Sequence, residues 1–236
     1  VSQEYAFVYS VGKATSQYNS KDTDFGAKLV MTDGTVKSVI IDSDDVKSCK
    51  DNDLDTYEKN VIKKFGWKLV SYSVNDDGTY SLTVKKNSNG SEAALDVMSA
   101  AGKTDVIKNG TARINTDNGT YYADKNTVYL INENNDDGDD FNVYVGYNNV
   151  PNVEAIGTAN SAQLMGQGKG SDSNPTASSS TDAASATGYA VYAKDGVAKV
   201  VVVTDAEVSG SSNDVIFVVG NPTAKTNKTG STEYYV

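Results

Sequence analysis

GYAVYAKDGVAKVVVVTD, residues 188–205, is the stretch that decides the fold class of this chain. In its first run, 188–193, Tyr189, Val191 and Ala193 alternate with small or apolar neighbours, and the run leads into a turn at Asp195-Gly196. The second run, 197–203, is apolar on both faces, which is typical of a strand in the middle of a sheet. The stretch therefore predicts a β-hairpin whose second strand is central, and a mainly β protein around it.

Residues 1–88 predict a small β-domain with the order three strands, a helix and two strands. Residues 5–13 have strand composition, and 27–42 form two alternating runs joined at Asp33-Gly34, a strong hairpin signal. Residues 67–86 predict a second hairpin. This order is that of a five-stranded OB-like barrel, with another small barrel containing a helical plug as the alternative.

The helix of this first domain is predicted over residues 55–66. Asp55 and Glu58 have the spacing of a capping box at its start, and Gly66 can end it. The apolar residues between them repeat with the period of one helical face. A connecting segment, 89–104, follows the first domain. Within it, SEAALDVMSAAG (91–102) predicts one further short helix.

Residues 105–222 predict a second β-domain, again built from strands between Asn, Asp and Gly clusters. Residues 158–187 contain few large apolar side chains and are expected to be a low-complexity insertion in it. We expect 223–236 to be a linker and the start of a following module, because EYYV near the end resembles EYAFV at residues 4–8. The predicted strands of the second domain lie in 105–115, 120–132, 140–150, 188–205 and 214–221.

Composition excludes several classes of function. The chain carries 21 Lys and Arg against 31 Asp and Glu, a net charge of −10. Nucleic acids and anionic lipids are therefore poor partners, because both need a cationic surface. Histidine is absent, which excludes Ser-His-Asp and Cys-His catalysis and most zinc sites. Cys49 is the single cysteine, so it has no partner for an internal disulfide. No run of the sequence approaches the ~20 apolar residues needed for membrane insertion.

Four strings resemble the repetitive, β-rich extracellular regions of bacterial surface proteins that carry S-layer homology domains. They are NTVYLIN (126–132), DFNVYVGYNNVPNVE (140–154), GYAVYAKDGVAKVVVVTDAE (188–207) and DVIFVVGN (214–221). The resemblance implies an extracellular location at the bacterial cell surface, with neighbouring modules of the same polypeptide and cell-wall glycan as expected partners. The strings are packing and turn signatures, so the resemblance implies no catalytic residues.

The acidic run NENNDDGDD, residues 132–140, is the candidate metal site. Asp136, Asp137, Asp139 and Asp140 could supply the oxygen ligands that Ca²⁺ prefers. The alternative interpretation is a solvated turn between two strands, because the run does not fit the EF-hand pattern.

A second acidic run, DNDLDTYE at 51–58, places Asp51, Asp53 and Asp55 at alternate positions. It lacks the later Gly and Glu of a calcium loop, so it is interpreted as local structure, with Asp55 as the helix cap.

The abundant tyrosines suggest a platform for sugar rings or, more simply, ordinary strand residues. Candidates for such a platform include Tyr121, Tyr122, Tyr144 and Tyr147. The sequence therefore predicts a non-catalytic structural or spacer module of an S-layer-associated surface protein. A carbohydrate- or ligand-binding adhesion module, with or without calcium, is the first alternative. A carbohydrate-active enzyme with two carboxylates facing each other is the second.

Overall fold

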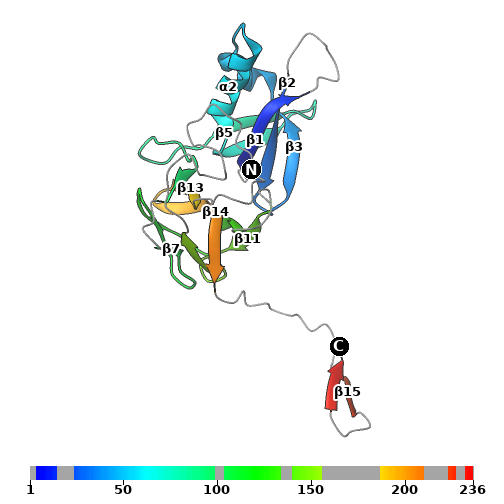
Figure 1. Cartoon of the computed structure of the whole chain (residues 1–236), viewed down its shortest axis with the longest axis vertical. Coiled ribbons are helices and arrows are strands. Elements are labelled where there is room, and N and C mark those ends of the chain that lie inside the picture. Colours follow the sequence, from blue (N-terminus) through cyan, green and yellow to red (C-terminus); the bar gives the residue numbers. More distant parts are fainter. Residues whose placement is uncertain are drawn as a thin grey trace, which may run out of the picture.

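The computed structural model describes the side chains of most of the chain and the backbone of two further strands. The fold is mainly β, as predicted, with two large sheets and one two-stranded sheet. Figure 1 shows the first large sheet and its helices at one end of the main body and the second sheet at the other. The described residues are 4–14, 24–98, 104–133, 140–155, 187–209, 223–226 and 232–235.

The first sheet has the strand order β3-β2-β1-β4-β5, and every neighbouring pair is antiparallel. Both predicted hairpins are confirmed, with turns at Gly34 and Gly78, whose φ angles are 85° and 84°. The central strand β1 forms hydrogen-bonded ladders on both sides. The strands are β1 (Glu4–Ala14), β2 (Asp24–Met31), β3 (Val36–Ile40), β4 (Leu69–Val74) and β5 (Tyr80–Val84).

The two edges of the first sheet approach each other beside the helices. Ile41 and Tyr80 form an isolated parallel bridge, and the amide of Asp42 donates to the carbonyl of Tyr80 at 2.9 Å. No longer ladder joins β3 to β5, both of which are fully described. The strand order agrees with the expected OB-like arrangement, but the sheet is not a fully closed barrel.

Three short helical segments connect β3 to β4: α1 (Ser43–Val46), the 3₁₀ turn η1 (Lys47–Cys49) and α2 (Leu54–Phe65). The predicted apolar face of α2 packs against β1, and Val61 and Phe65 are fully buried there. Cys49 is buried in the same core. The helix therefore covers one face of the first sheet.

The predicted cap of α2 is wrong by two residues. Asp53, and not Asp55, is the N-cap, and its carboxylate accepts hydrogen bonds from the amides of Asp55 and Thr56 at 3.1 and 3.3 Å. The Asp55 side chain instead pairs with Lys13 of β1 at 3.0 Å. Because the helix begins at Leu54, Asp55 lies inside its first turn and its side chain is not needed as the cap.

The helix predicted over 91–102 is also wrong in its described part, residues 91–98. Isolated bridges join Lys86 to Glu92 and Lys68 to Ala94, and the strand β6 (Asp96–Val97) follows. Ala93 and Leu95 are buried while the residue between them is only partly buried, which is the two-residue period of extended chain. Residues 99–102 lie outside the described residues.

The second sheet has the order β11-β10-β14-β12-β7-β8-β9, and β13 pairs with β14 and β6. The prediction for β14 is confirmed, because it lies in the centre of the sheet and its residues 200–203 are buried. A parallel bridge between Val197 and Tyr122 also pairs β9, at the end of this order, with β14. The strands are β7 (Thr104–Ile107), β8 (Arg113–Thr116), β9 (Gly119–Tyr122), β10 (Val128–Glu133), β11 (Asn142–Val145), β12 (Asn152–Ala155), β13 (Gly188–Lys194) and β14 (Val197–Ser209).

Near the C-terminal end of the sequence, β15 (Thr223–Thr226) and β16 (Thr232–Tyr235) pair antiparallel with each other. The strand predicted over 214–221 lies outside the described residues, as does all of the predicted insertion except Thr187. The longest helix in the described part of the chain is α2, with 12 residues, and no described helix is long and apolar enough to cross a membrane.

Candidate functional site

The predicted calcium ligands can be located only in part. Asp136, Asp137 and Asp139 lie outside the described residues, and Asp140 is exposed. The carbonyl of Asp140 accepts a hydrogen bond from the side chain of Asn132 at 2.8 Å. Among the described residues, no group of three or more His, Cys, Asp or Glu side chains could hold a metal ion. Calcium binding by this turn remains a prediction.

The second acidic run has a local structural role, as predicted. The Asp51 carboxylate accepts a hydrogen bond from the amide of Asp53 at 2.9 Å, and Asp53 in turn caps α2. These side chains bind backbone amides at the start of the helix, which is the ordinary use of aspartate at a helix N-terminus.

The candidate tyrosines mostly contribute to packing. Tyr121 is partly buried against the core of the second sheet, whereas its neighbour Tyr122 is 54% exposed. The two rings therefore lie on opposite faces of the strand. Tyr144 and Tyr147 also pack against that core. Tyr189 is buried there, and burial raises its pKa to about 12, so its hydroxyl stays neutral and accepts a hydrogen bond from Asn118.

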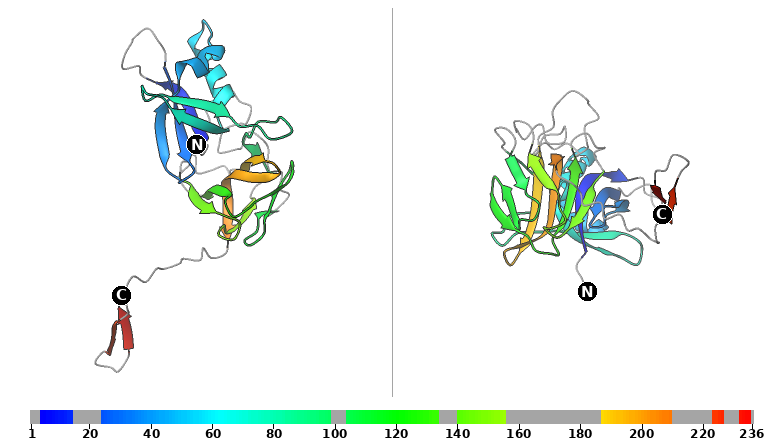
Figure 2. Two further views of the ribbon diagram at one scale, coloured as in Figure 1. Left: turned by 180° about the vertical axis from the view of Figure 1, so that it is seen from behind. Right: turned by 90° about the horizontal axis from the view of Figure 1, so that it is seen from below.

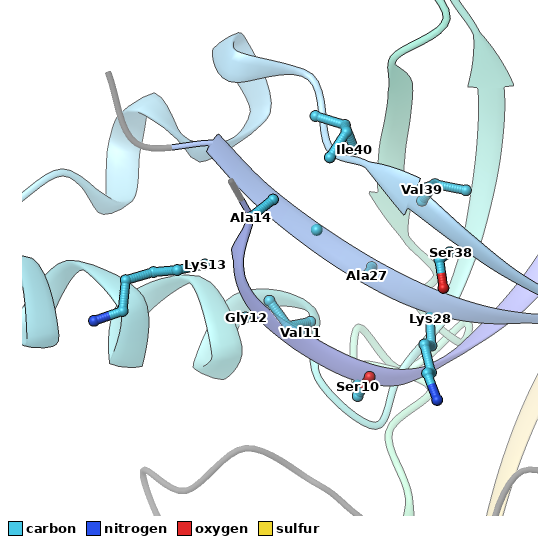
Figure 3. Close-up of a pocket in the computed structure, with 11 residues that line it drawn as sticks. Ser10, Val11, Gly12, Lys13, Ala14, Ala27, Lys28, Ser38, Val39 and Ile40 are labelled. Carbon is cyan, nitrogen blue, oxygen red and sulfur yellow. The ribbon is translucent and has the colours of Figure 1, made fainter. Parts of the chain in front are cut away.

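A shallow, open groove of about 340 Å³ crosses β1, β2 and β3 (Figure 3). It lies on the face of the first sheet opposite to α2, which we call the outer face. Gly12 lies opposite Gly26, and Gly26 lies opposite Ile40, so two of the three neighbouring positions lack a side chain. Lys13 at its rim points toward α2, where it pairs with Asp55. The groove is lined by residues 10–14, 26–28 and 38–40.

The chemistry of the groove lining is limited. It contains no carboxylate, so it does not offer the facing pair that glycoside hydrolysis requires. It also contains no aromatic ring on which a sugar could stack. Small residues, aliphatic side chains and two lysines make up the surface.

An apolar core, which we call the junction core, lies between the first and the second sheet. Side chains from the first sheet, the connecting segment and the second sheet meet in it, and Phe7 contacts both Trp67 and Phe141 with ring centroids 6.3 and 6.1 Å apart. Figure 2 shows the two sheets on either side of this region. The buried members are Phe7, Tyr9, Val30, Leu69, Ala93, Leu95, Leu130, Phe141, Ala190, Tyr192, Val200 and Val202.

The alternation of strand residues divides the outer face of the first sheet between the junction core and the groove. In β2, Gly26, Lys28 and Val30 share this outer face, because every second residue of a strand points the same way. Val30 is fully buried in the junction core, whereas Gly26 and Lys28 line the groove. In β2, the large apolar residue of this face therefore lies in the part that the second sheet covers.

The β2–β3 turn also contacts the second sheet. A Cβ atom on Gly34 would lie 2.7 Å from Cγ2 of Val143 and 3.2 Å from the carbonyl oxygen of Phe141. Real Cβ atoms do not approach other atoms as closely as 2.7 Å. Glycine is therefore required here both for its positive φ angle and for the close contact.

The connecting segment is hydrogen-bonded to both sheets. On the side of the first sheet, the amide of Leu69 donates to Ala93 and the amide of Leu95 donates to Trp67, at 2.9 and 2.8 Å. On the side of the second sheet, β6 pairs with Gly188 and Tyr189 of β13. The segment therefore joins the sheets as extended chain with a bonded edge on each side.

Aromatic rings and a lysine reinforce the same boundary. The rings of Tyr5 and Tyr192 lie 5.5 Å apart, and the Lys85 ammonium group lies 6.0 and 5.0 Å from their centroids. Burial raises the pKa of Tyr5. Analysis of the sequence did not identify the junction, although the apolar outward positions of β1 and β2 were a signal for it.

Comparisons of the chain with protein-family models, with curated proteins and with solved structures each found no match. Its function is therefore inferred from its own residues and their arrangement.

Proposed function

We propose that this chain is a non-catalytic structural module of a bacterial cell-surface protein, acting as a spacer in the extracellular, S-layer-associated envelope. The observation that carries this proposal is the junction core, which joins the two sheets through fully buried side chains such as Phe7, Leu130 and Val202. A spacer must hold its length, and a buried apolar boundary opposes bending between its parts.

The position of the central strands supports a mechanical role. β1 is hydrogen-bonded to β2 on one side and β4 on the other, and β14 is bonded to β10 and β13. Removing β1 would break two ladders together, and removing β14 would break its ladders with β10, β12 and β13. Such a strand resists extraction more than an edge strand does.

The surface suits an extended array of modules that must not aggregate. The edge strand β5 is protected, because the carboxylate of Asp45 accepts a hydrogen bond from the amide of Leu82 at 2.8 Å. A capped edge is a poor template for a strand from another chain. The net charge of −10 adds repulsion between copies. We expect neighbouring modules of the same polypeptide to be the main partners.

Co-sedimentation with purified bacterial cell walls distinguishes the spacer from an adhesion module. The spacer should stay in solution both with calcium and with a chelator. Salt-resistant retention on the wall would contradict the spacer proposal and favour binding of wall glycan. Loss of that retention with chelator, and in a variant with Asp136, Asp137, Asp139 and Asp140 changed to Asn, would assign the binding to calcium at this turn.

Stretching single molecules of the whole chain tests the mechanical part of the proposal. We expect a distinct unfolding force that falls in Leu130→Ala, because this change removes fully buried apolar volume from the junction core. Extension without a force peak would contradict a mechanical role. The exposed change Thr83→Ala on β5 is the matched control and should leave the force unchanged.

A further inference from the structure

One side chain makes two directional contacts across the boundary between the sheets. Asn87 follows β5 of the first sheet, and its Nδ2 donates to the carbonyl of Val191 in β13 at 3.1 Å. Its Oδ1 accepts from the amide of Ala193 at 2.8 Å. The carboxamide is therefore used as donor and acceptor at once, on two residues of the same strand.

These two bonds reproduce what a neighbouring strand would provide. In a parallel ladder, one residue donates to the carbonyl before its partner residue and accepts from the amide after it. Asn87 does this around Tyr192, beyond Gly188 and Tyr189, where β6 pairs with the same strand. Its side chain thus continues the edge that β6 begins. A side-chain amide offers both a donor and an acceptor in a fixed plane without a change of protonation.

The backbone holds Asn87 in place for this contact. Its amide donates to the carbonyl of Ser91, and its carbonyl accepts from the amide of Gly90, both at 2.8 Å. This local turn is anchored further by Asn89, whose side chain accepts from the amide and the hydroxyl of Ser91. Asn89 is exposed, and both of these hydrogen bonds lie within the turn. The two asparagines therefore form a matched pair with different roles.

We propose that the Asn87 carboxamide is a lock that fixes the second sheet in register against the first, so that both open as one cooperative unit. The junction core supplies most of the buried apolar contact, but such contacts are non-directional and tolerate small slides. The two hydrogen bonds permit one alignment only, because a slide along β13 would leave the carbonyl of Val191 and the amide of Ala193 without partners. This coupling is a property of the fold and does not depend on the proposed role as a spacer.

Native-state hydrogen exchange of the whole chain, followed residue by residue at increasing denaturant, tests the lock. In the unchanged protein, we expect the slowest amides of both sheets, such as Val70 in β4 and Val202 in β14, to merge into one opening reaction. In Asn87→Ala, the amide of Ala193 should exchange about 10- to 100-fold faster, and the two sheets should follow separate opening reactions. Asn89→Ala should keep the single reaction.

Two results of these exchange measurements would overturn the proposal. Separate opening reactions in the unchanged protein would overturn the proposal without any variant. A single shared reaction in Asn87→Ala, with Ala193 no faster than in Asn89→Ala, would overturn it as well. If Asn87→Ala does not fold, Asn87→Asp decides, because its carboxylate keeps the acceptor for Ala193 but cannot donate to Val191. A shared reaction in that variant would contradict the need for both bonds, and separate reactions would support it.

Discussion

Replacing Gly34 with alanine should destabilise the chain more than the same change at Gly78, although the two turns are alike. Their φ angles are 85° and 84°. In each turn, the preceding aspartate accepts from the amide and the hydroxyl of the following threonine: Asp33 from Thr35, and Asp77 from Thr79. The difference lies in the surroundings, because a Cβ on Gly34 would meet the second sheet and one on Gly78 would meet no atom within 4 Å.

Two contributions determine how much each glycine change lowers the free energy of unfolding. The positive φ angle costs an alanine about 1 kcal/mol in either turn. At Gly34 alone, the new methyl group would lie 2.7 Å from Cγ2 of Val143, which faces the junction core. Forcing one extra carbon into a packed contact costs about 1–3 kcal/mol. We therefore expect Gly34→Ala to lower the free energy of unfolding by about 1–3 kcal/mol more than Gly78→Ala.

Denaturant unfolding followed by the fluorescence of Trp67 measures both changes. Trp67 is the single tryptophan and packs against the junction core. Adding Val143→Ala to Gly34→Ala should recover part of the extra loss, because it removes the atom that the new methyl group contacts. A difference between the two glycine variants of less than about 0.5 kcal/mol, which is within ordinary additivity error, would refute the contact argument.

Three further predictions concern other parts of the fold. Asp53→Ala should destabilise the chain by about 1 kcal/mol through loss of the α2 cap, and Asp55→Ala should have a smaller effect in the same denaturant titration. Hydrogen bonds from the following threonines lower the pKa of Asp33 and Asp77. Both carboxylates therefore stabilise the folded state above an unfolded pKa of about 4, and this stabilisation is lost as the pH falls through the lower folded pKa. Urea midpoints measured from neutral to acidic pH should fall less steeply in Asp33→Asn and Asp77→Asn. Leu130→Ala should cost about 2–5 kcal/mol, because it empties a fully buried position of the junction core, and calorimetry checks this.

Local patterns were enough to predict most strands of the fold. Asp33-Gly34 and Asp77-Gly78 favour tight turns through residues that tolerate positive φ angles, and the hairpins formed where these pairs occur. The run 197–203 is apolar at every position except Lys199, and such a run is stable only where both faces are covered. These features depend on neighbours within a few residues, so the sequence contains them directly.

Contacts between distant residues decided the rest. Residues 91–98 have a composition that suits a helix, yet Ala93 and Leu95 are extended, because distant chain segments supply their hydrogen bonds and bury alternate side chains. Asp53 and Asp55 are the same residue type, so cap preference alone does not distinguish them. Which of them caps α2 depends on where the helix begins and on Lys13 in β1, which pairs with Asp55.

The alternation of strand residues predicts that one face of β1 and β2 carries Phe7 and Val30, but it does not say what covers them. By itself the sequence determined the hairpins, the central strand and the acidic, histidine-free surface chemistry. Only the tertiary structure placed the second sheet over that face and brought Asn87 to the edge of β13, 104 residues from Val191. Packing partners far apart in the chain meet only in the folded state, and no local propensity records them.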